Sequence, residues 1–303
     1  MTPWVECVPN FSEGRDADVL AALRQAITGS AGVHLLDWSA DEDHNRSVFT
    51  FVGPPREASE ALFAAACVAA ERIDLRRHQG QHPRIGALDV APFIPLERLS
   101  WDAAIETAHA FGRRLWDELA IPVYFYARAA LAPERERLEN VRRGGFEGLR
   151  QEVLTDLARR PDVGGQALHP SAGATAVGAR KLLVAFNVNL ETRDPALARR
   201  IARSIRASSG GYPAVKALGL ELPHAGLTQV SMNLTDYEVT SPSTVFARIE
   251  AEARAAGVSV AGSELIGLIP RAALKPLGAE GMRIQGFSPD RILDNRIRQA
   301  RAG

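Results

Sequence analysis

Cysteine, net charge and long apolar runs are all scarce in this sequence. Only two cysteines, Cys7 and Cys67, occur among 303 residues, which excludes a disulfide scaffold and favours buried free thiols. Acidic and basic residues number 36 each, so no net charge directs the chain to nucleic acid or an anionic membrane. No apolar run reaches the ~20 residues of a membrane helix, and the N-terminus has no signal-peptide pattern. We expect a soluble, cytoplasmic protein.

Hydrophobic periodicity predicts the same order of elements in both halves of the chain. The first half is expected to contain strands at 3–8, 33–38, 46–53 and 87–94, and helices at 16–28 and 56–73, with Asp16 capping the first helix. A helix at 101–119 and a strand at 122–127 extend this half. In the second half we expect strands at 182–190, 218–222, 227–234 and within 257–269, helices at 194–207 and 240–256, and a terminal helix at 289–301.

This repeated order is the split βαβ pattern. It predicts an α/β protein (an α+β sandwich) of two tandem ferredoxin-like split-βαβ subdomains, with mixed sheets, helices on one face and a substrate cleft between the subdomains. Residues 161–180 contain four glycines and two prolines and are expected to form a long loop or an interdomain connection. We place the subdomain boundary there, giving residues 1–178 and 179–303.

The stretch HQGQHPRIG, residues 78–86, places two histidines in an irregular backbone before a predicted strand. A zinc pair of the H-x-x-x-H type would need one helix face, which Gly80 and Pro83 disfavour. One or both histidines can instead satisfy hydrogen bonds of the loop. A neutral imidazole facing a cleft is also suited to proton transfer, which singles out His82.

Polar stretches interrupt the apolar pattern in the same way at 8–16, 39–47 and 161–180, where loops commonly carry binding residues. Arg15, Arg46 and Arg84 can bind carboxylates through their forked guanidinium groups, or can be solvated surface charges. The acidic residues 41–43 favour a solvated turn over a metal site. No P-loop, dinucleotide-binding fingerprint or G-x-S-x-G elbow is present.

Several stretches together resemble one family, the formiminotransferase domain of glutamate formimidoyltransferases. They include VECVPNFSEGRD, DEDHNRSVFTFVG, HQGQHPRIGALDVAPFIP, HPSAGATAVGARKLLVAFNVNL, QVSMNLTDYEVT and ELIGLIPRAAL, in family order across the chain. The resemblance implies a two-part α/β fold, a homodimer, and transfer of a formimidoyl group from N-formimidoyl-L-glutamate to tetrahydrofolate in histidine breakdown and one-carbon metabolism. Since the sequence ends at Gly303, any cyclodeaminase activity is expected to reside elsewhere.

The resemblance also assigns site residues. The second histidine of the H-Q-G-x-H-P-R motif, His82, corresponds to the catalytic residue of the family. The glycine-rich loop corresponds to its folate-binding segment, here Val163, Gly164, Gly165, Gln166, Ala167, Leu168, His169, Pro170, Ser171 and Ala172.

Formimidoyl transfer requires a group that removes a proton from N5 of tetrahydrofolate and returns one to the departing nitrogen, for which His82 is the candidate. Candidate substrate-binding residues are Arg46 and Arg84 for the glutamate carboxylates, Asp41 (or Asp43) for a cationic amidine, and Asn10 for lining the site. Tetrahydrofolate is the co-substrate and no metal is expected.

Three alternatives stay open at this point. The enzyme could transfer a formyl group from 5-formyltetrahydrofolate to glutamate, in folate salvage. The chain could bind folate without turnover, or it could be a metal-dependent hydrolase that uses His44, His78 and His82.

Overall fold

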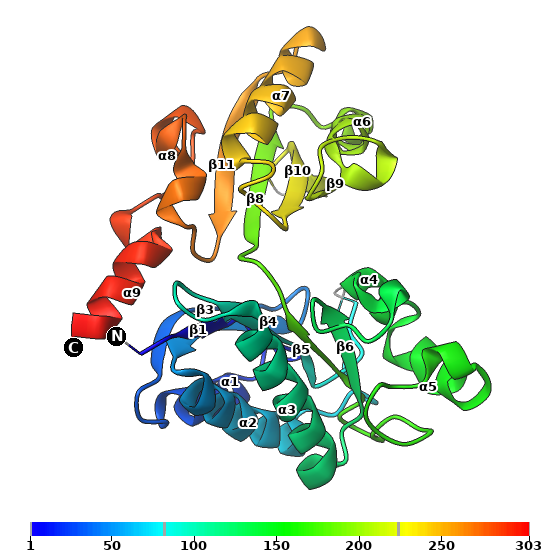
Figure 1. The fold of residues 1–303 in the computed structure, drawn as a ribbon. Helices are drawn as coiled ribbons and strands as arrows, with labels where there is room; N and C mark the ends of the chain where they lie inside the picture. The colour runs from blue at the N-terminus through cyan, green and yellow to red at the C-terminus, as the bar shows by residue number, and fades with distance from the viewer. Residues whose placement is uncertain (1, 81–82, 223–224, 303) are drawn as a thin grey trace. The chain divides into compact units, whose positions relative to one another are not determined.

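In the computed structural model, residues 2–80, 83–222 and 225–302 are described. The chain forms two compact units, Met1–Arg180 and Lys181–Gly303, each with its own sheet and hydrophobic core. Both have mixed α and β structure, as the repeated order of elements predicts (Figure 1).

The sheet of the first unit is a split βαβ arrangement with two strands added at one edge. Its strands are β1 (Val5–Cys7), β2 (Asn10–Phe11), β3 (His34–Asp41), β4 (Arg46–Gly53), β5 (Leu88–Pro95), β6 (Val123–Ala127) and β7 (Thr175–Ala179). β1 and β2 lie between β4 and β5, and β3 pairs with the other side of β4, all antiparallel. β7 and then β6 continue parallel to β5. The predicted split βαβ core is therefore confirmed.

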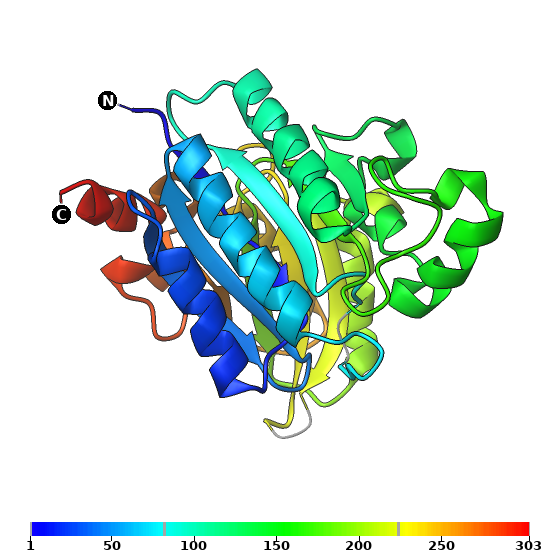
Figure 2. The same cartoon turned by 90° about the horizontal axis from the view of Figure 1, so that it is seen from below.

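Three helices cover one face of this sheet: α1 (Ala17–Thr28), α2 (Pro55–Arg72) and α3 (Trp101–Leu119). They run side by side in Figure 2. Asp16 caps α1 as predicted, accepting hydrogen bonds from the backbone N–H groups of Asp18 and Val19 at 2.9 and 3.1 Å. Cys7 is fully buried in this core, and burial raises the pKa of its thiol well above the ordinary value.

The glycine-rich segment 161–180 is only partly the loop that its composition predicts. Its last five residues form β7, which is completely buried in the sheet between β5 and β6. Here a buried parallel strand made of small residues has no alternating pattern that would reveal it. Helices α4 (Leu138–Val141) and α5 (Gly145–Thr155), which precede this segment, were also missing from the expected elements.

The second unit has the same split βαβ order without added strands. Its strands β8 (Val184–Leu190), β9 (Val215–Leu222), β10 (Leu227–Leu234) and β11 (Val260–Ile266) form an antiparallel sheet in the order β11-β8-β10-β9. Helices α6 (Pro195–Ile205) and α7 (Pro242–Ala255) pack on it. The chain continues through α8 (Gly278–Gly281) and ends in α9 (Leu293–Ala302).

Candidate active site

The polar loops of the first unit meet around the side chain of Asn45. Its Oδ1 accepts a hydrogen bond from the backbone N–H of Gly14 at 2.9 Å, and its Nδ2 donates to the carbonyl of Gln79 at 3.0 Å. Asn45 has a left-handed backbone with φ of 47°, a conformation that asparagine tolerates better than most residues. A Cβ at Gly80 would lie 2.3 Å from the carbonyl oxygen of His44, so only glycine fits this approach. Asn45 thus joins three loops that are distant in sequence.

His78 is held in one neutral tautomer by its two neighbours. Its Nδ1 lies 2.9 Å from Nε of Arg84, which can only donate, so Nε2 carries the hydrogen that is donated to the Asn45 carbonyl at 2.9 Å. Burial, assisted by the charge of Arg84, lowers the pKa of His78 although the hydrogen bond to Asn45 opposes the shift. Both ring nitrogens are occupied, so His78 has the loop-stabilising role. The candidate catalytic residue, His82, lies outside the described residues.

Arg84 is engaged by a carboxylate of its own chain. Its Nη1 and Nη2 donate to Oε2 and Oε1 of Glu147 at 3.0 and 2.7 Å, and Nη2 also lies 3.3 Å from the carbonyl of His78. Glu147 stands on α5, a helix that sequence reasoning missed. The guanidinium of Arg84, which was expected to bind a substrate carboxylate, therefore binds the carboxylate of Glu147 in this structure.

A buried aspartate, Asp89, organises the start of β5. Asn10 pairs with Val90 while Phe11 pairs with Leu88, so Asp89 is the extra residue of a β-bulge. Its carboxylate is 2% exposed, accepts from the backbone N–H groups of Ile85 and Gly86 at 2.7 and 3.3 Å, and forms an ion pair with Arg142. The lone aspartate inside an apolar run was the sequence signal for this residue. Nothing in the sequence indicated Arg142 as its partner.

Arg46, at the start of β4, is a largely buried cation. Among the described residues its guanidinium makes neither a hydrogen bond nor an ion pair, although Asp89 and Asp41 are near enough to influence it. Burial and, to a lesser extent, the like charge of Arg142 lower the pKa of Arg46 to about 10, although the charges of Asp89 and Asp41 oppose this shift. An unsatisfied guanidinium next to a second one is an arrangement suited to an anion.

Two other candidate residues have local partners. Asp41 accepts from the backbone N–H of His44 and contacts its Nδ1, both at 2.8 Å. Burial alone would raise the pKa of Asp41, but these hydrogen bonds outweigh it and lower the pKa. Asn10 donates through Nδ2 to the carbonyl of Val8 at 3.1 Å.

The two ends of segment 163–172, the predicted folate-binding segment, contact different parts of the first unit. Its beginning lies beside α3 and β6, where Val123 and Val163 form a β-bridge. Its end reaches the loop that carries the histidines, because the Leu75 N–H donates to the Ser171 carbonyl and the Ala87 N–H to the Ala172 carbonyl, both at 2.9 Å. Only this end of the predicted folate segment joins the polar loops described above.

Two features are absent from the part of the chain that the structure describes. In residues 2–80, 83–222 and 225–302 there is no group of three or more His, Cys, Asp or Glu side chains arranged to hold a metal ion. No helix within the same ranges has the length and apolar character needed to cross a bilayer.

The fold and these loops define an α/β protein of two split βαβ units, the first carrying a cluster of His, Arg and Asp side chains where its loops meet. Residues 4–180 match the model of the formiminotransferase domain, N-terminal subdomain, and residues 185–280 match that of the formiminotransferase domain. The chain belongs to the formiminotransferase domain family, as its sequence motifs predict.

Curated relatives agree with this family. The chain is 43% identical over 298 residues to a glutamate formimidoyltransferase of Streptococcus pyogenes, covering 98% of this chain and 99% of that protein. It is 40% identical to a glutamate formimidoyltransferase of Thermoplasma acidophilum, covering 98% of both. A formimidoyltransferase-cyclodeaminase of Rattus norvegicus is 45% identical over 281 residues, which are 90% of this chain and 51% of the rat protein.

Proposed function

We propose that this protein transfers the formimidoyl group of N-formimidoyl-L-glutamate to tetrahydrofolate, giving 5-formimidoyltetrahydrofolate and L-glutamate. The observation that carries the proposal is the similarity, over nearly the full length of both chains, to two proteins named glutamate formimidoyltransferase. The names of these relatives favour transfer of a formimidoyl group over the alternative reaction, transfer of a formyl group from 5-formyltetrahydrofolate to glutamate. Tetrahydrofolate serves as co-substrate.

In this reaction N5 of tetrahydrofolate attacks the amidine carbon, and the bond to the glutamate nitrogen then breaks. His82 is proposed to take the proton from N5 and to return one to the departing nitrogen. Such a proton-transfer group contributes about 10²–10⁴-fold in rate. The fixed position of His78, four residues earlier, supports this assignment because it anchors the loop at its N-terminal side.

Arg46 is the first candidate for a glutamate carboxylate, since it is largely buried and has no partner among the described residues. Arg84 could take this role only by exchanging Glu147 for the substrate. Asp41 is proposed to face the amidine and Asn10 to line the site. The segment 163–172 is proposed to bind folate, chiefly through its end at residues 169–172, which contacts the histidine loop.

Three further properties belong to this proposal. The subdomains are residues 1–178 and 179–303, a division supported by the unit boundary at Arg180 and by the two matched ranges. The enzyme acts as a homodimer in the cytoplasm. It uses no metal in the transfer.

The function is tested by single-turnover transfer from formimidoylglutamate to tetrahydrofolate, followed by folate absorbance. His82→Ala should retain folate binding and lose at least about a hundredfold in rate. His34→Ala is the matched control, because His34 lies at the opposite end of β3 from Asp41. No product from the wild type would refute the function, and a fast His82→Ala variant would refute only the role of His82.

A further inference from the structure

The side chains of His78 and Arg84 contact each other directly and so connect the two ends of a short span of chain. Nε of Arg84 donates to Nδ1 of His78 at 2.9 Å, and Nη2 of Arg84 lies 3.3 Å from the His78 carbonyl. Five residues, 79–83, lie between them in the sequence, and the candidate catalytic residue His82 is one of these. A contact between the ends of so short a span restricts the positions available to the residues within it.

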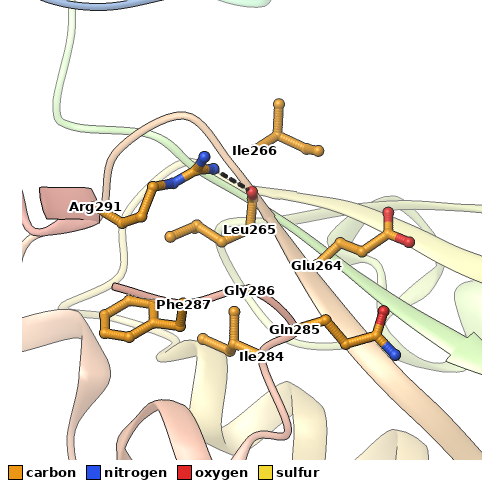
Figure 3. Close-up of a pocket in the computed structure, with 8 residues that line it drawn as sticks. All are labelled: Glu264, Leu265, Ile266, Ile284, Gln285, Gly286, Phe287 and Arg291. Carbon is orange, nitrogen blue, oxygen red and sulfur yellow. Dashed lines mark hydrogen bonds between the residues drawn. The ribbon is translucent and has the colours of Figure 1, made fainter. Parts of the chain in front are cut away.

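The acceptor of this hydrogen bond makes the contact sensitive to pH. Arg291 in the second unit provides a contrast, because its Nη2 donates to the backbone carbonyl of Leu265 at 2.6 Å, beside a cavity of about 260 Å³ (Figure 3). A backbone carbonyl takes up no proton near neutral pH, whereas an imidazole changes its charge between about pH 5 and 8. The contact of Arg84 with His78 can therefore be lost under conditions in which the contact of Arg291 stays.

Only the neutral form of His78 can accept the hydrogen bond from Arg84. Nε2 of His78 already donates to the carbonyl of Asn45 at 2.9 Å, so a further proton must bind at Nδ1. That proton would face the Nε–H of Arg84 and place two donors and two positive charges against each other. Nε2 donates to Asn45 in both forms. Protonation therefore breaks the contact of His78 with Arg84 and leaves its contact with Asn45.

The environment of His78 favours this neutral form. Burial lowers the pKa of His78, the hydrogen bond to the Asn45 carbonyl opposes the shift, and the charge of Arg84 adds to it. Glu13 and Arg15, on the loop before α1, have smaller and opposite effects. Oε1 of Glu13 accepts from the Arg15 N–H at 2.7 Å, so the two charges lie next to each other.

The other charged groups on the segments around His78 are bound to partners. Both carboxylate oxygens of Glu147, on α5, accept from Arg84. The hydrogen bond from Arg84 and, to a smaller extent, the charge of His78 lower the pKa of Glu147. Two further pairs lie on the neighbouring loops, Asp41 with His44 at 2.8 Å and Asp74 with Arg76 at 2.7 Å.

We propose that His78 is a positioning residue for the transfer reaction, and that only its neutral form, by holding Arg84, keeps the stretch 78–86 in the arrangement that transfer requires. Protonation at Nδ1 separates the two side chains and slows the reaction. The inference rests on the proposed function, because transfer is one of its readouts. It adds an acid sensitivity to the one expected from His82, which must be neutral to act as a base.

The first experiment counts the protons that inhibit transfer. The dependence of log(kcat/KM) on pH is measured from about pH 5 to 8 for the full-length wild type and for His78→Asn. Oδ1 of asparagine lies near the position of Nδ1, can accept from Arg84, and takes up no proton. At pH 8 this variant should have kcat/KM within about threefold of the wild type. At acid pH its profile should be less steep than that of the wild type by one proton, because His82 alone remains to be protonated.

A second variant separates the two hydrogen bonds of His78. In His78→Gln the side-chain amide can donate to Asn45, but it provides no acceptor at the position of Nδ1. We expect kcat to fall about tenfold or more at every pH, while KM for formimidoylglutamate changes less than about threefold. The matched control is His34→Asn. His34 stacks on Trp4 at the start of β3, so both the rate and the slope should stay unchanged.

Two kinetic results would overturn the proposal. One is an acid slope in His78→Asn equal to that of the wild type, and the other is an equal fall in kcat in His78→Asn and His78→Gln. A slope that becomes less steep in His34→Asn as well would also contradict it, since the lost proton would then not belong to His78.

NMR of the ¹⁵N-labelled wild type tests the contact without a variant and without turnover. His78 should be the neutral tautomer with its hydrogen on Nε2, and the Nε–H signal of Arg84 should shift with the same midpoint as the His78 ring. An Arg84 signal that ignores the titration of His78 would refute the contact. Transfer with equal slopes would refute the role of His78 and leave the function intact. Absence of transfer in a protein whose Arg84 signal follows His78 would refute the function and, with it, the positioning role, and would leave only the pH-dependent contact.

Discussion

Arg84 and Glu147 lie 63 positions apart and are joined by two parallel hydrogen bonds of 3.0 and 2.7 Å. The third nitrogen of the same guanidinium, Nε, donates to His78. One arginine therefore connects α5 to His78, the first residue of the stretch HQGQHPRIG.

The first prediction concerns this connection. Arg84→Lys keeps the positive charge but cannot donate the two parallel hydrogen bonds to Glu147 and the third to His78, so His78 should be held less firmly. We expect kcat to fall about tenfold or more, while unfolding free energy falls by only ~1 kcal/mol because Glu147 is largely exposed. Steady-state kinetics and urea unfolding measure the two effects. Glu147→Gln should give the same kinetic change, and unchanged kcat in both variants would show that the connection does not position the loop.

The second prediction is a pH dependence that arises from Glu6 in β1. This carboxyl group is buried, its Oε2 has no hydrogen-bond partner, and burial raises its pKa to about 7 although Arg180 opposes the shift. In the folded state it stays protonated between about pH 4.5 and 7, whereas in the unfolded chain it ionises, so its contribution to stability falls as pH rises through this window.

Glu6→Gln should remove that contribution. The unfolding free energy of the variant minus that of the wild type should increase by roughly 1–3 kcal/mol from pH 4 to pH 8. Chemical unfolding at each pH provides the values. A difference that stays constant with pH would mean that Glu6 titrates alike in the folded and unfolded states.

The third prediction is that Arg46 opposes stability. A partly buried cation that has no partner among the described residues is costly, so Arg46→Met should raise the free energy of unfolding by ~1 kcal/mol in the absence of ligand. If Arg46 binds a glutamate carboxylate, the same substitution should raise KM for formimidoylglutamate at least about tenfold. Arg24→Met, on the exposed surface of α1, serves as the control for both measurements. Lower stability together with unchanged KM would contradict the assignment.

The fourth prediction concerns Arg159, which holds α4 and α5 together. Its side chain is 9% exposed and donates to Glu152 at 2.7 Å and to the carbonyls of Asn140 and Arg143 at 2.9 and 2.7 Å. Arg159→Met leaves these acceptors unpaired and should cost about 3–5 kcal/mol in urea unfolding. The exposed Arg150 on α5 provides the matched substitution Arg150→Met, expected to be close to neutral. Equal stability of the two variants would refute the role of Arg159.

Several helices and strands could be predicted from the sequence because the order of their apolar and polar residues matches the side of each element that is buried in the structure. The alternating run 46–53 became β4 and the run 227–234 became β10, each with the predicted bounds. Asp16 became the cap of α1, since a cap depends only on residues next to it. The order of elements then led to the split βαβ arrangement of both sheets.

Other features depend on contacts between distant parts of the chain. β7 consists of small residues that become a strand only because β5 and β6 flank it. Asp89 and Arg142, like Arg84 and Glu147, have partners more than 50 positions away, which a single sequence does not reveal. Similarly, the role of His78 follows from Asn45 and Arg84, not from its spacing to His82.

The sequence by itself determined the family, the order of secondary structure and the loops that carry polar side chains, because these follow from motifs and from periodicity along the chain. The tertiary structure decided which of those side chains have partners. It paired Glu147 with Arg84, and it left Arg46 without a partner in the described part of the chain. Burial and contacts with distant residues determine whether a side chain is charged and whether it is free to bind a ligand. Neither can be deduced from the neighbouring residues in the sequence.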